Sequence, residues 1–422
     1  MTVLVVGGGG REHAVIKKLK ESPRVGRIFA APGNGGISRD AECVPIKAGD
    51  VPALVAFAKE AGVDFAVIAP EDPLVHGAVD AFSAAGIRAF GPTADAAILE
   101  GSKIFAKNFM KRHGIPTAPF SEFDDLGKAL RYLESAEYPV VVKADGLAAG
   151  KGVIIAADRA EAEAAVRSMM EDGAFGESGK RLEIEKFLTG PEVSVLAFCD
   201  GEHVFPMASS MDHKRAYDGD RGPNTGGMGT VAPNPFYTDE VARQAKERIF
   251  IPTVRGMREE GRPFRGCLYF GLMITDDGPY VIEYNCRFGD PETQVVLPLL
   301  DSDLLDVMEK TVDGTLTADD VRIRDGHACC VIMAHEGYPG KYEGGFEIVI
   351  PREIENDVYV AGGTVSDGKL ISGGGRVLGV SATAPTLEEA VGLAYRRVGM
   401  ISFPGSFYRR DIGKRALSAY NG

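Results

Sequence analysis

The stretch around residue 285 has the spacing of a site that binds a cation and an anion together. Glu283, Asn285 and Arg287 are separated by two positions each and follow an apolar pair. Alternate side chains of a β-strand point to the same face, so we expect these three to meet. A carboxylate, an amide oxygen and a guanidinium suit a divalent cation, a phosphate and an anionic substrate.

Two further carboxylates, Asp290 and Glu292, lie in the Pro-containing loop after this strand and would add to the same site. The alternative is an exposed strand edge with ordinary surface charges. Val281, Ile282 and Phe288 are apolar positions typical of a core, so the strand end should border packed structure, and this alternative is disfavoured.

A glycine-rich segment is a second candidate site: Lys143 and Lys151 bracket Gly146 and Gly150, and Gly152 follows. Glycines let backbone N–H groups approach phosphate oxygens, and lysines neutralise the phosphate charge. The spacing is not that of a P-loop, and both flanking segments have the pattern of strands. An ordinary flexible hairpin is the alternative, but the two lysines favour phosphate binding.

The segment Glu185-Lys186-Phe187-Leu188, with Glu192 after it, ends a predicted strand on apolar residues. Such a strand end can offer backbone groups to the edge of an adenine and an apolar face to its ring, and Glu192 could bind ribose hydroxyls. Taken alone, a plain strand and loop explain the segment better. The nucleotide-binding interpretation is supported by the position of this segment between the glycine-rich segment and the strand of Glu283.

Four glycines, Gly7 to Gly10, follow the first predicted strand and precede Arg11, Glu12 and His13. A dinucleotide-binding turn is disfavoured, because Glu12 or His13 occupies the place of the third glycine and no acidic residue ends the second strand. A glycine turn at a helix N-terminus can still bind a single phosphate. From this segment alone, sugar-phosphate binding and a purely structural role remain equal alternatives.

A long polar stretch contains Asp212, His213, Lys214, Arg215 and, in its glycine-rich second half, Asn224. This composition predicts a loop from 212 to 229. Loops this long are usually functional or disordered. Its length and neighbours favour substrate contact over a solvated loop. His213 is an acid–base candidate, but a histidine within a basic run is more often a hydrogen-bonding partner.

Composition limits the classes of protein to consider. With 422 residues the chain exceeds the ~250–300 at which one core stops growing, so we expect about three domains. A net charge of −13 argues against nucleic-acid binding. No apolar run has the ~18–20 residues of a membrane span, and no secretory signal is expected. Six cysteines without a CxxC pair are typical of free thiols, so we expect a cytoplasmic protein.

The predicted elements divide the chain into three parts. Alternating strands and helices predict an open parallel α/β domain over residues 1–101, whose ligands would lie at strand ends such as Glu71-Asp72. Residues 102–326 form the predicted centre, with a small movable lobe at about 121–189. Residues 327–422 are β-rich and predict an α+β domain.

Taken in this order, the bracketed glycines, the Glu-Lys-Phe-Leu segment and the Glu-x-Asn-x-Arg strand resemble an ATP-grasp enzyme. Further segments are similar to the glycinamide ribonucleotide synthetase family: Gly-Gly-Arg-Glu-His-Ala at 9–14, Ala-Pro-Gly-Asn at 31–34, Gly-Pro-Thr-Ala at 91–94, Leu-Glu-Gly-Ser-Lys at 99–103, the glycine-rich segment at 143–152, Asp-His-Lys-Arg at 212–215, Gly-Pro-Asn-Thr-Gly-Gly-Met-Gly at 222–229 and Asn-Cys-Arg-Phe-Gly-Asp-Pro-Glu-Thr-Gln at 285–294. The resemblance covers nearly the whole chain, and the last two segments are highly specific.

The resemblance implies a two-lobed ATP-grasp centre that ligates glycine to 5-phosphoribosylamine. ATP is consumed, and glycinamide ribonucleotide, ADP and phosphate are released by way of a glycyl phosphate. It implies Mg²⁺ or Mn²⁺ as the cation, and small molecules as the only partners, without nucleic acid or membrane. We expect a monomer.

The resemblance also assigns roles to individual residues. The ATP site comprises Lys103, Lys143, Gly146, Gly150, Lys151, Gly152, Glu185, Lys186, Phe187, Leu188 and Glu192. The glycine and amine site comprises Gly9, Gly10, Arg11, Glu71, Asp72, Asp212, Lys214, Arg215, Asn224, Arg287, Asp290 and Glu292. Glu283 and Asn285 bind the metal. Arg287, Lys143 and Lys151 stabilise charge in catalysis, and the loop 144–152 closes as a lid.

The chain departs from the wider ATP-grasp superfamily on the strand before Glu283. Many ATP-grasp enzymes have a second acidic metal ligand there, where this chain has Tyr269-Phe270-Gly271-Leu272. Either Asp290 or Glu292 replaces that ligand, or ATP phosphates hold the first metal ion.

Three other functions are alternatives to this one. They are another ATP-grasp ligase acting on a purine intermediate, a nicotinamide-dependent oxidoreductase and a non-catalytic nucleotide sensor. The segment at 285–294 disfavours the first, and the incomplete glycine motif disfavours the second. Arg287 beside the metal pair disfavours the third.

Overall fold

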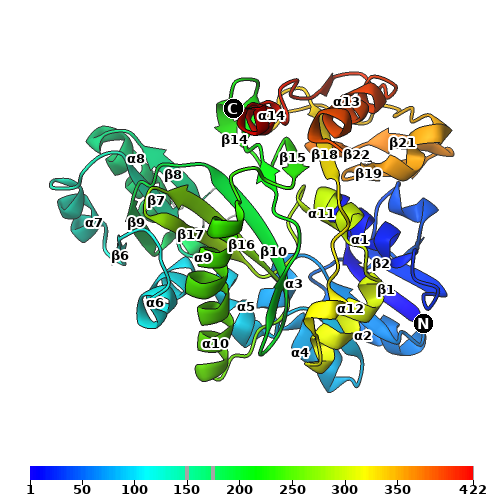
Figure 1. Cartoon of the computed structure of the whole chain (residues 1–422), viewed down its shortest axis with the longest axis horizontal. Helices are drawn as coiled ribbons and strands as arrows, with labels where there is room; N and C mark the ends of the chain where they lie inside the picture. Colours follow the sequence, from blue (N-terminus) through cyan, green and yellow to red (C-terminus); the bar gives the residue numbers. More distant parts are fainter. Residues whose placement is uncertain (148–151, 173–175, 422) are drawn as a thin grey trace.

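The computed structural model of the chain describes residues 1–147, 152–172 and 176–421. Figure 1 shows the C-terminal elements lying beside the N-terminal sheet at one end of the molecule and a small lobe with α7 and α8 at the other end. The long strands β10, β16 and β17 lie between them. No helix among the described residues is long and apolar enough to cross a membrane.

The N-terminal part is an open sheet of five parallel strands in the order β3-β2-β1-β4-β5. Its middle strands are buried apolar runs, as expected for a parallel sheet covered by helices on both faces. This arrangement confirms the predicted α/β class. The strands are β1 (Thr2–Gly7), β2 (Arg27–Pro32), β3 (Glu42–Cys43), β4 (Phe65–Ile68) and β5 (Arg88–Phe90). The helices are α1 (Gly10–Leu19), α2 (Val51–Glu60), α3 (Glu71–Val75), α4 (Ala78–Ala84) and α5 (Ala94–Gly101).

One predicted helix of this part was wrong. The apolar pattern over residues 74–85 predicts a single helix, whereas the structure has the short helices α3 and α4. Gly77 separates them with a φ of +81°, a left-handed conformation that favours glycine and ends a helix. The helix α3 begins at Glu71, shortly after the strand β4 and at the C-terminal edge of the sheet.

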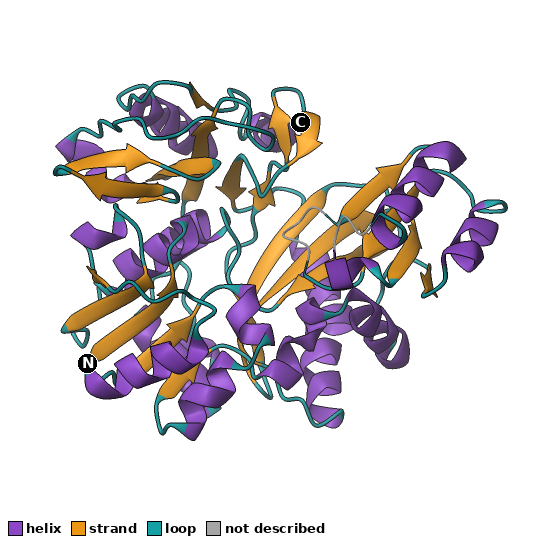
Figure 2. Cartoon of the chain, turned by 180° about the vertical axis from the view of Figure 1, so that it is seen from behind, coloured by secondary structure: helices purple, strands orange, loops and turns teal. Residues whose placement is uncertain are grey.

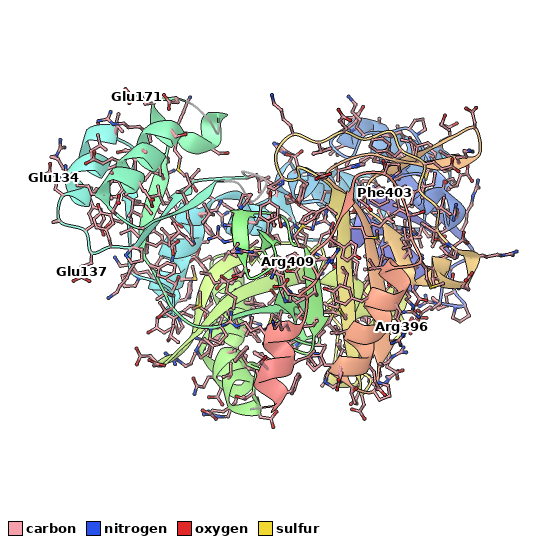
Figure 3. The ribbon with its side chains drawn as sticks, turned by 90° about the horizontal axis from the view of Figure 1, so that it is seen from above. Glu134, Glu137, Glu171, Arg396, Phe403 and Arg409 are labelled. Atoms are coloured by element: carbon pink, nitrogen blue, oxygen red, sulfur yellow. The ribbon has the colours of Figure 1, made fainter. Side chains whose placement is uncertain are left out.

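The small lobe is an antiparallel sheet in the order β6-β9-β7-β8 with helices on one face. Its strands alternate: Val140, Val142 and Ile184 are buried against the helices, whereas Lys143 and Glu185 belong to the opposite face. Figure 3 shows Glu134, Glu137 and Glu171 on the outer edge of the lobe. The elements are β6 (Phe120–Phe123), α7 (Leu126–Leu133), β7 (Val140–Ala144), β8 (Val153–Ala156), α8 (Arg159–Met170) and β9 (Leu182–Lys186).

The central sheet has the order β11-β10-β16-β17 and is antiparallel. It shares one apolar core with the N-terminal sheet, since Leu4, Phe270 and Tyr284 belong to the same buried cluster. The elements here are α6 (Lys103–His113), β10 (Glu192–Asp200), β11 (Val204–Pro206), β16 (Arg265–Thr275), β17 (Gly278–Asn285), and α9 (Asp239–Ala245) and α10 (Ile251–Glu259) joined by a π-helical turn (Lys246–Phe250).

The predicted loop from 212 to 229 is more regular than expected. It contains an antiparallel hairpin of β13 (Arg215–Tyr217) and β14 (Arg221–Asn224). All four residues of β14 are exposed, so the hairpin has no apolar alternation by which the sequence could reveal it.

The C-terminal sheet takes two strands from the centre of the chain and has the order β12-β15-β18-β22-β19, with β23 paired to β18. Figure 2 shows this part from behind, with the β20–β21 hairpin above the N-terminal sheet. The strands are β12 (Met211–Asp212), β15 (Gly229–Ala232), β18 (His327–His335), β19 (Val358–Val360), β20 (Gly363–Ser366), β21 (Lys369–Ser372), β22 (Arg376–Ala384) and β23 (Ser406–Phe407). The helices are α11 (Thr293–Leu299), α12 (Leu304–Asp313), α13 (Leu387–Val398) and α14 (Lys414–Asn421).

Candidate active site

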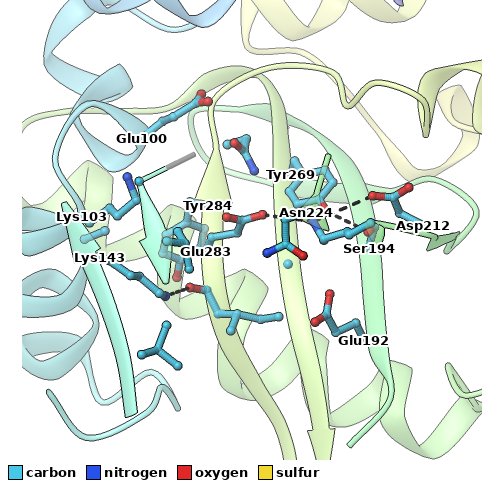
Figure 4. Close-up of a pocket in the computed structure, with 18 of the residues that line it drawn as sticks. Glu100, Lys103, Lys143, Glu192, Ser194, Asp212, Asn224, Tyr269, Glu283 and Tyr284 are labelled. Carbon is cyan, nitrogen blue, oxygen red and sulfur yellow. Dashed lines mark hydrogen bonds and ion pairs between the residues drawn. The ribbon is translucent and has the colours of Figure 1, made fainter. Parts of the chain in front are cut away.

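All three parts of the chain line one cavity of about 470 Å³. Figure 4 shows Lys103 and Lys143 on one side of Glu283, with Asn224 and Asp212 on the other. A cavity of this size suits a small-molecule substrate. Because its walls come from segments far apart in the sequence, it forms only when the three parts pack together.

Glu283 reaches the cavity from the edge strand β17. The partner of Glu283 on β16 is Gly271, and a Cβ atom built on Gly271 would lie 2.9 Å from Glu283 Cγ. The glycine therefore leaves the space that the Glu283 side chain occupies. This contact gives a physical reason for the missing acidic residue on the preceding strand.

Cations surround Glu283. Lys214 Nζ lies 3.7 Å from Glu283 Oε1, and Lys103 donates to the carbonyl of Gly146 at 2.8 Å. Burial raises the pKa of Glu283, but Lys214, Lys143, Lys103 and Arg287 outweigh burial and hold the pKa below its ordinary value. Glu283 is therefore a carboxylate at neutral pH. The lysines would also offset the charge of a bound polyphosphate.

Arg287 lies just beyond the end of β17 and is held from four directions. Its Nε lies 3.0 Å from Glu71 Oε2 and its Nη2 3.3 Å from Glu100 Oε1. Nη2 also donates to Asn285 Oδ1 at 3.2 Å, and Nη1 to the carbonyl of Phe288. Burial lowers the pKa of Arg287, but Glu100 and Glu71 raise it above its ordinary value, so the guanidinium stays charged. The side chain is preorganised at the cavity wall.

The opposite wall holds a group of carboxylates. Burial and the neighbouring Glu292 raise the pKa of Asp212 to about 8. Glu292 is 4% exposed, and its side chain has no hydrogen-bond or ion-pair partner among the described residues. Asp290 accepts a hydrogen bond from Gln294 at 2.7 Å and lies 3.4 Å from Arg376. An unpartnered buried carboxylate in a cavity needs a cation or a donor from a ligand.

The donor set fits a divalent cation that is shared with a ligand. Among the described residues no group of three or more His, Cys, Asp or Glu side chains could hold a metal by itself. Glu283 and Asn285 nevertheless both line the cavity. Mg²⁺ typically binds through one or two protein oxygens together with substrate phosphates, so two ligands are enough when a nucleotide is bound.

The structure brings most of the predicted site residues to the cavity wall. They are Arg11, Glu71, Lys103, Lys143, Gly146, Gly152, Glu185, Lys186, Phe187, Leu188, Glu192, Asp212, Lys214, Asn224, Glu283, Asn285, Arg287, Asp290 and Glu292. It does not bring Gly9, Gly10, Asp72 or Arg215 to this wall. Gly150 and Lys151, with the middle of the predicted lid, lie outside the described residues.

The N-terminal glycines have close packing contacts. A Cβ atom on Gly8 would lie 2.3 Å from the carbonyl oxygen of Gly33, and one on Gly10 would lie 2.8 Å from Gln294 Nε2. The N–H of Gly9 donates to Glu12 Oε2 at 2.6 Å. These contacts require glycine for structural reasons, whatever else the turn binds.

His213 is a hydrogen-bonding partner, as its sequence context indicates. Its Nδ1 lies 3.0 Å from the carbonyl of Gly229, and its Nε2 accepts from the N–H of Gly413 at 3.2 Å. Burial lowers the pKa of His213 to about 4, so the ring is neutral. Both ring nitrogens are occupied, and the histidine links the hairpin region to the C-terminal segment.

Several residues of the cavity wall were missed by the sequence interpretation: Glu100, Lys107, Glu183, Ser194, Tyr269 and Arg376. Each is a single charged or polar residue in an otherwise ordinary helix or strand. Arg376 donates to the carbonyls of Gly226 at 2.7 Å and Asp290 at 2.8 Å, so it joins two loops of the site. One sequence pattern could have indicated some of them. Glu183 and Glu185 are two positions apart in a strand, so they share one face of the small sheet, and Lys143 lies on the same face.

Comparison with known proteins places this geometry in a family. Models of the phosphoribosylglycinamide synthetase N domain, ATP-grasp (A) domain and C domain match residues 1–100, 101–293 and 328–415. The phosphoribosylamine–glycine ligase of Caldanaerobacter subterraneus is 48% identical over 98% of this chain and 99% of the relative. That of Salmonella typhimurium is 49% identical over 99% of each chain.

A solved structure supports the same assignment. The crystal structure of phosphoribosylamine–glycine ligase from Thermotoga maritima is 36% identical in sequence and superposes with a TM-score of 0.85. The match covers 98% of this chain and 100% of that one. With full-length relatives and a common architecture, the chain belongs to the phosphoribosylglycinamide synthetase family.

Proposed function

We propose that the chain ligates glycine to 5-phosphoribosylamine in purine biosynthesis and that the cavity is its active site. The γ-phosphoryl group of ATP passes to the carboxylate of glycine, giving ADP and glycyl phosphate. The amine of phosphoribosylamine then attacks the glycyl carbonyl, and phosphate leaves. The observation that carries this proposal is the convergence of Lys103, Lys143, Lys214 and Arg287 around Glu283 in one cavity.

The cations answer an electrostatic difficulty of the first step. A carboxylate must approach a polyphosphate, and two like unit charges at 4 Å repel by ~1 kcal/mol in water and ~4 kcal/mol at an effective dielectric of 20. Lys103 and Lys143 stand where they would neutralise the nucleotide phosphates. Arg287, held rigid by Glu71 and Glu100, would stabilise charge on the transferring group. Because these groups are already oriented, little reorganisation is needed during the reaction.

Glu283 and Asn285 would hold the divalent cation, for which we propose Mg²⁺ or Mn²⁺. When bound, the cation supplies Lewis-acid polarisation of the phosphate oxygens. Glu292 and Asp212 lie on the other side of the cavity and would bind the ammonium group of glycine and the amine of the second substrate. Glu192, Phe187 and Leu188 would contact the nucleoside, and Arg11 and Glu71 the sugar-phosphate.

Three further features belong to the proposal. The domain bounds are 1–101, 102–326 and 327–422, with the small lobe at about 121–189. The enzyme acts as a monomer. It works in the cytoplasm, which suits six cysteines that are all free.

The test is a coupled measurement of ADP release. Purified protein with Mg²⁺, ATP, glycine and freshly prepared phosphoribosylamine should release ADP and form glycinamide ribonucleotide in equal amounts. Omission of either glycine or phosphoribosylamine should abolish product. ADP release at the same rate without glycine would contradict the proposal. The other ATP-grasp ligase considered from the sequence is not supported, since the full-length relatives share a single activity in their names.

A further inference from the structure

Lys107 is a fully buried lysine to which the mechanism above gives no role. It lies on α6 at the back of the cavity and is 2% exposed. Its Nζ lies 3.0 Å from Glu185 Oε2 and donates to Thr117 Oγ1 at 2.7 Å and to the carbonyl of Ala118 at 3.3 Å. All three donors of the ammonium group are therefore in use. A lysine is rarely buried unless such partners compensate its charge.

One set of contacts leads from Lys107 to the predicted phosphate lysine. Glu185 lies between two lysines, since its Oε1 is 2.5 Å from Lys143 Nζ. Lys143 Nζ in turn donates to the carbonyl of Ile282 at 3.0 Å. Burial raises the pKa of Glu185, but Lys143 and Lys107 outweigh burial and hold it at about 2. The charged carboxylate therefore ties α6 to the small lobe, and Lys143 ties the small lobe to β17.

A second set of contacts leads from Lys107 to the neighbouring residue of β17. Thr117 accepts from Lys107 and donates its own hydroxyl hydrogen to the carbonyl of Val281 at 2.8 Å. The N–H of Val281 donates to the carbonyl of Pro116 at 2.8 Å. Both sets of contacts thus end on consecutive carbonyl groups, those of Val281 and Ile282.

These carbonyls lie at an irregularity of the central sheet. The pairing of β16 with β17 steps from Gly271–Glu283 to Leu272–Val281, so Ile282 is the extra residue of a β-bulge. Bulges redirect the side chains beside them and leave one residue outside the ladder. The carbonyl of Ile282 receives Lys143 instead, and the next residue is Glu283. The geometry of the bulge therefore decides where the Glu283 carboxylate points.

We propose that Lys107 is a positioning residue of the nucleotide site, which fixes Lys143 through Glu185 and aims Glu283 through Thr117 and the bulge. The inference rests on the proposed roles of Lys143 and Glu283. Lys107 also affects the charge of the site. Without Lys107, the negative charge of Glu185 would cancel the positive charge of Lys143, and no net charge would remain. With Lys107, the two lysines and Glu185 keep one net positive charge beside the phosphates.

The two branches make separable predictions for binding of a nonhydrolysable ATP analogue, measured by calorimetry with and without Mg²⁺. Lys107→Met should weaken metal-free binding about tenfold. Lys143 would lose its fixed position, and the group of Lys143 and Glu185 would lose its net positive charge. Lys107→Met should also reduce the gain in affinity that Mg²⁺ provides. Thr117→Val keeps every charge, so it should leave metal-free affinity within about twofold and reduce only the Mg²⁺ gain by about tenfold.

Lys111 provides a matched control, since it is an exposed lysine of the same helix. Lys111→Met should bind the analogue like the unchanged protein. The inference is overturned if Lys107→Met keeps both the metal-free affinity and the Mg²⁺ gain. It is equally overturned if Thr117→Val keeps its Mg²⁺ gain, which decides the matter even when Lys107→Met does not fold.

Two more variants separate this inference from the proposed function. Lys143→Met should lose metal-free affinity, and Glu283→Gln should lose the Mg²⁺ gain. If both are impaired while Lys107→Met is not, only the positioning role is wrong. If neither is impaired, the proposed nucleotide site is wrong and the inference fails with it.

Discussion

Arg287 has a structural role and a proposed chemical role, and the structure allows the two to be separated by mutation. Replacing it with Met keeps an apolar stem of similar length but removes the guanidinium. Glu100, which is 8% exposed, then loses its charged partner at 3.3 Å. The other oxygen of Glu100 would still accept the N–H of Cys286 at 2.6 Å. One buried carboxylate is therefore left without a countercharge.

The expected loss of stability follows from that unpaired charge. Removing one partner of a buried ion pair costs about 3–5 kcal/mol. The loss of the Glu71 contact should add little, since the Glu71 side chain is 30% exposed and Arg11 lies 3.7 Å from it. Burial already raises the pKa of Glu100 above its ordinary value, so part of the cost will be relieved by protonation, and the lower end of the range is expected.

A second substitution should restore the fold but not the reaction. In Arg287→Met/Glu100→Gln no buried charge is unpaired, and the amide oxygen can still accept from Cys286. Most of the lost stability should return, whereas kcat should stay about 10²–10³-fold below that of the unchanged enzyme, because the charge on the transferring group lacks its guanidinium. Arg255→Met is the control. Arg255 is 55% exposed and forms a loose surface ion pair with Glu259 at 3.8 Å, so the substitution should lower the free energy of unfolding by under about 0.5 kcal/mol.

Thermal unfolding and steady-state turnover of the four proteins test this reasoning. If the double variant regains activity together with stability, Arg287 acts only through the fold, and its catalytic role is refuted. If Arg287→Met is as stable as the unchanged protein, the burial argument for Glu100 is wrong.

Three further predictions concern the same cavity. Glu283→Gln should reduce kcat about tenfold more than it reduces affinity for an ATP analogue, because a metal-bridged charge matters most in the transition state; equal losses in rate and affinity would contradict this. Gly271→Asp should lower activity and Mg²⁺ affinity, since its Cβ atom would lie 2.9 Å from Glu283 Cγ; tighter Mg²⁺ binding would show instead that a second carboxylate can be accommodated. Burial and Glu185 raise the pKa of Glu183 from 4.5 to about 8, so the folded protein holds a proton that the unfolded chain releases. The stability that this bound proton provides is complete below pH ~4.5 and is lost as pH rises towards ~8. Glu183→Gln should therefore show a smaller fall in Tm between pH ~5 and ~8 than the unchanged protein.

The predictable part of the site is the part that is contiguous in sequence. Glu283, Asn285 and Arg287 lie within five positions, so their types and spacing alone indicated a cation and an anion. Even there, only the first two are on the strand, because β17 ends at Asn285. Arg287 reaches the same cavity because Glu71 and Glu100 hold it there, and these partners are more than 180 positions away in the chain.

The missed residues of the site are isolated in the sequence from its other members. Glu100 is the penultimate residue of the short helix α5, and Lys107 is one of several lysines on α6. Nothing in their neighbourhood distinguishes them from surface charges, because burial is decided by segments that fold against them from elsewhere. The exposed hairpin β13–β14 was missed for a related reason, since a strand without a buried face has no apolar period.

Gly271 and Lys107 bear together on how the proposed metal site could work with few protein ligands. The glycine opens the space for Glu283. In the role proposed for Lys107, its contacts hold the bulge beside Glu283, so that one carboxylate would be placed firmly where two would otherwise share a cation. A lone ligand tolerates less error in position than a pair, since no second oxygen compensates for a displacement. The buried ion pair of Lys107 with Glu185 brings little net stability, because desolvation offsets most of the attraction. Its value therefore lies in orientation, which explains why charge is buried at the back of the cavity where apolar packing would serve stability as well.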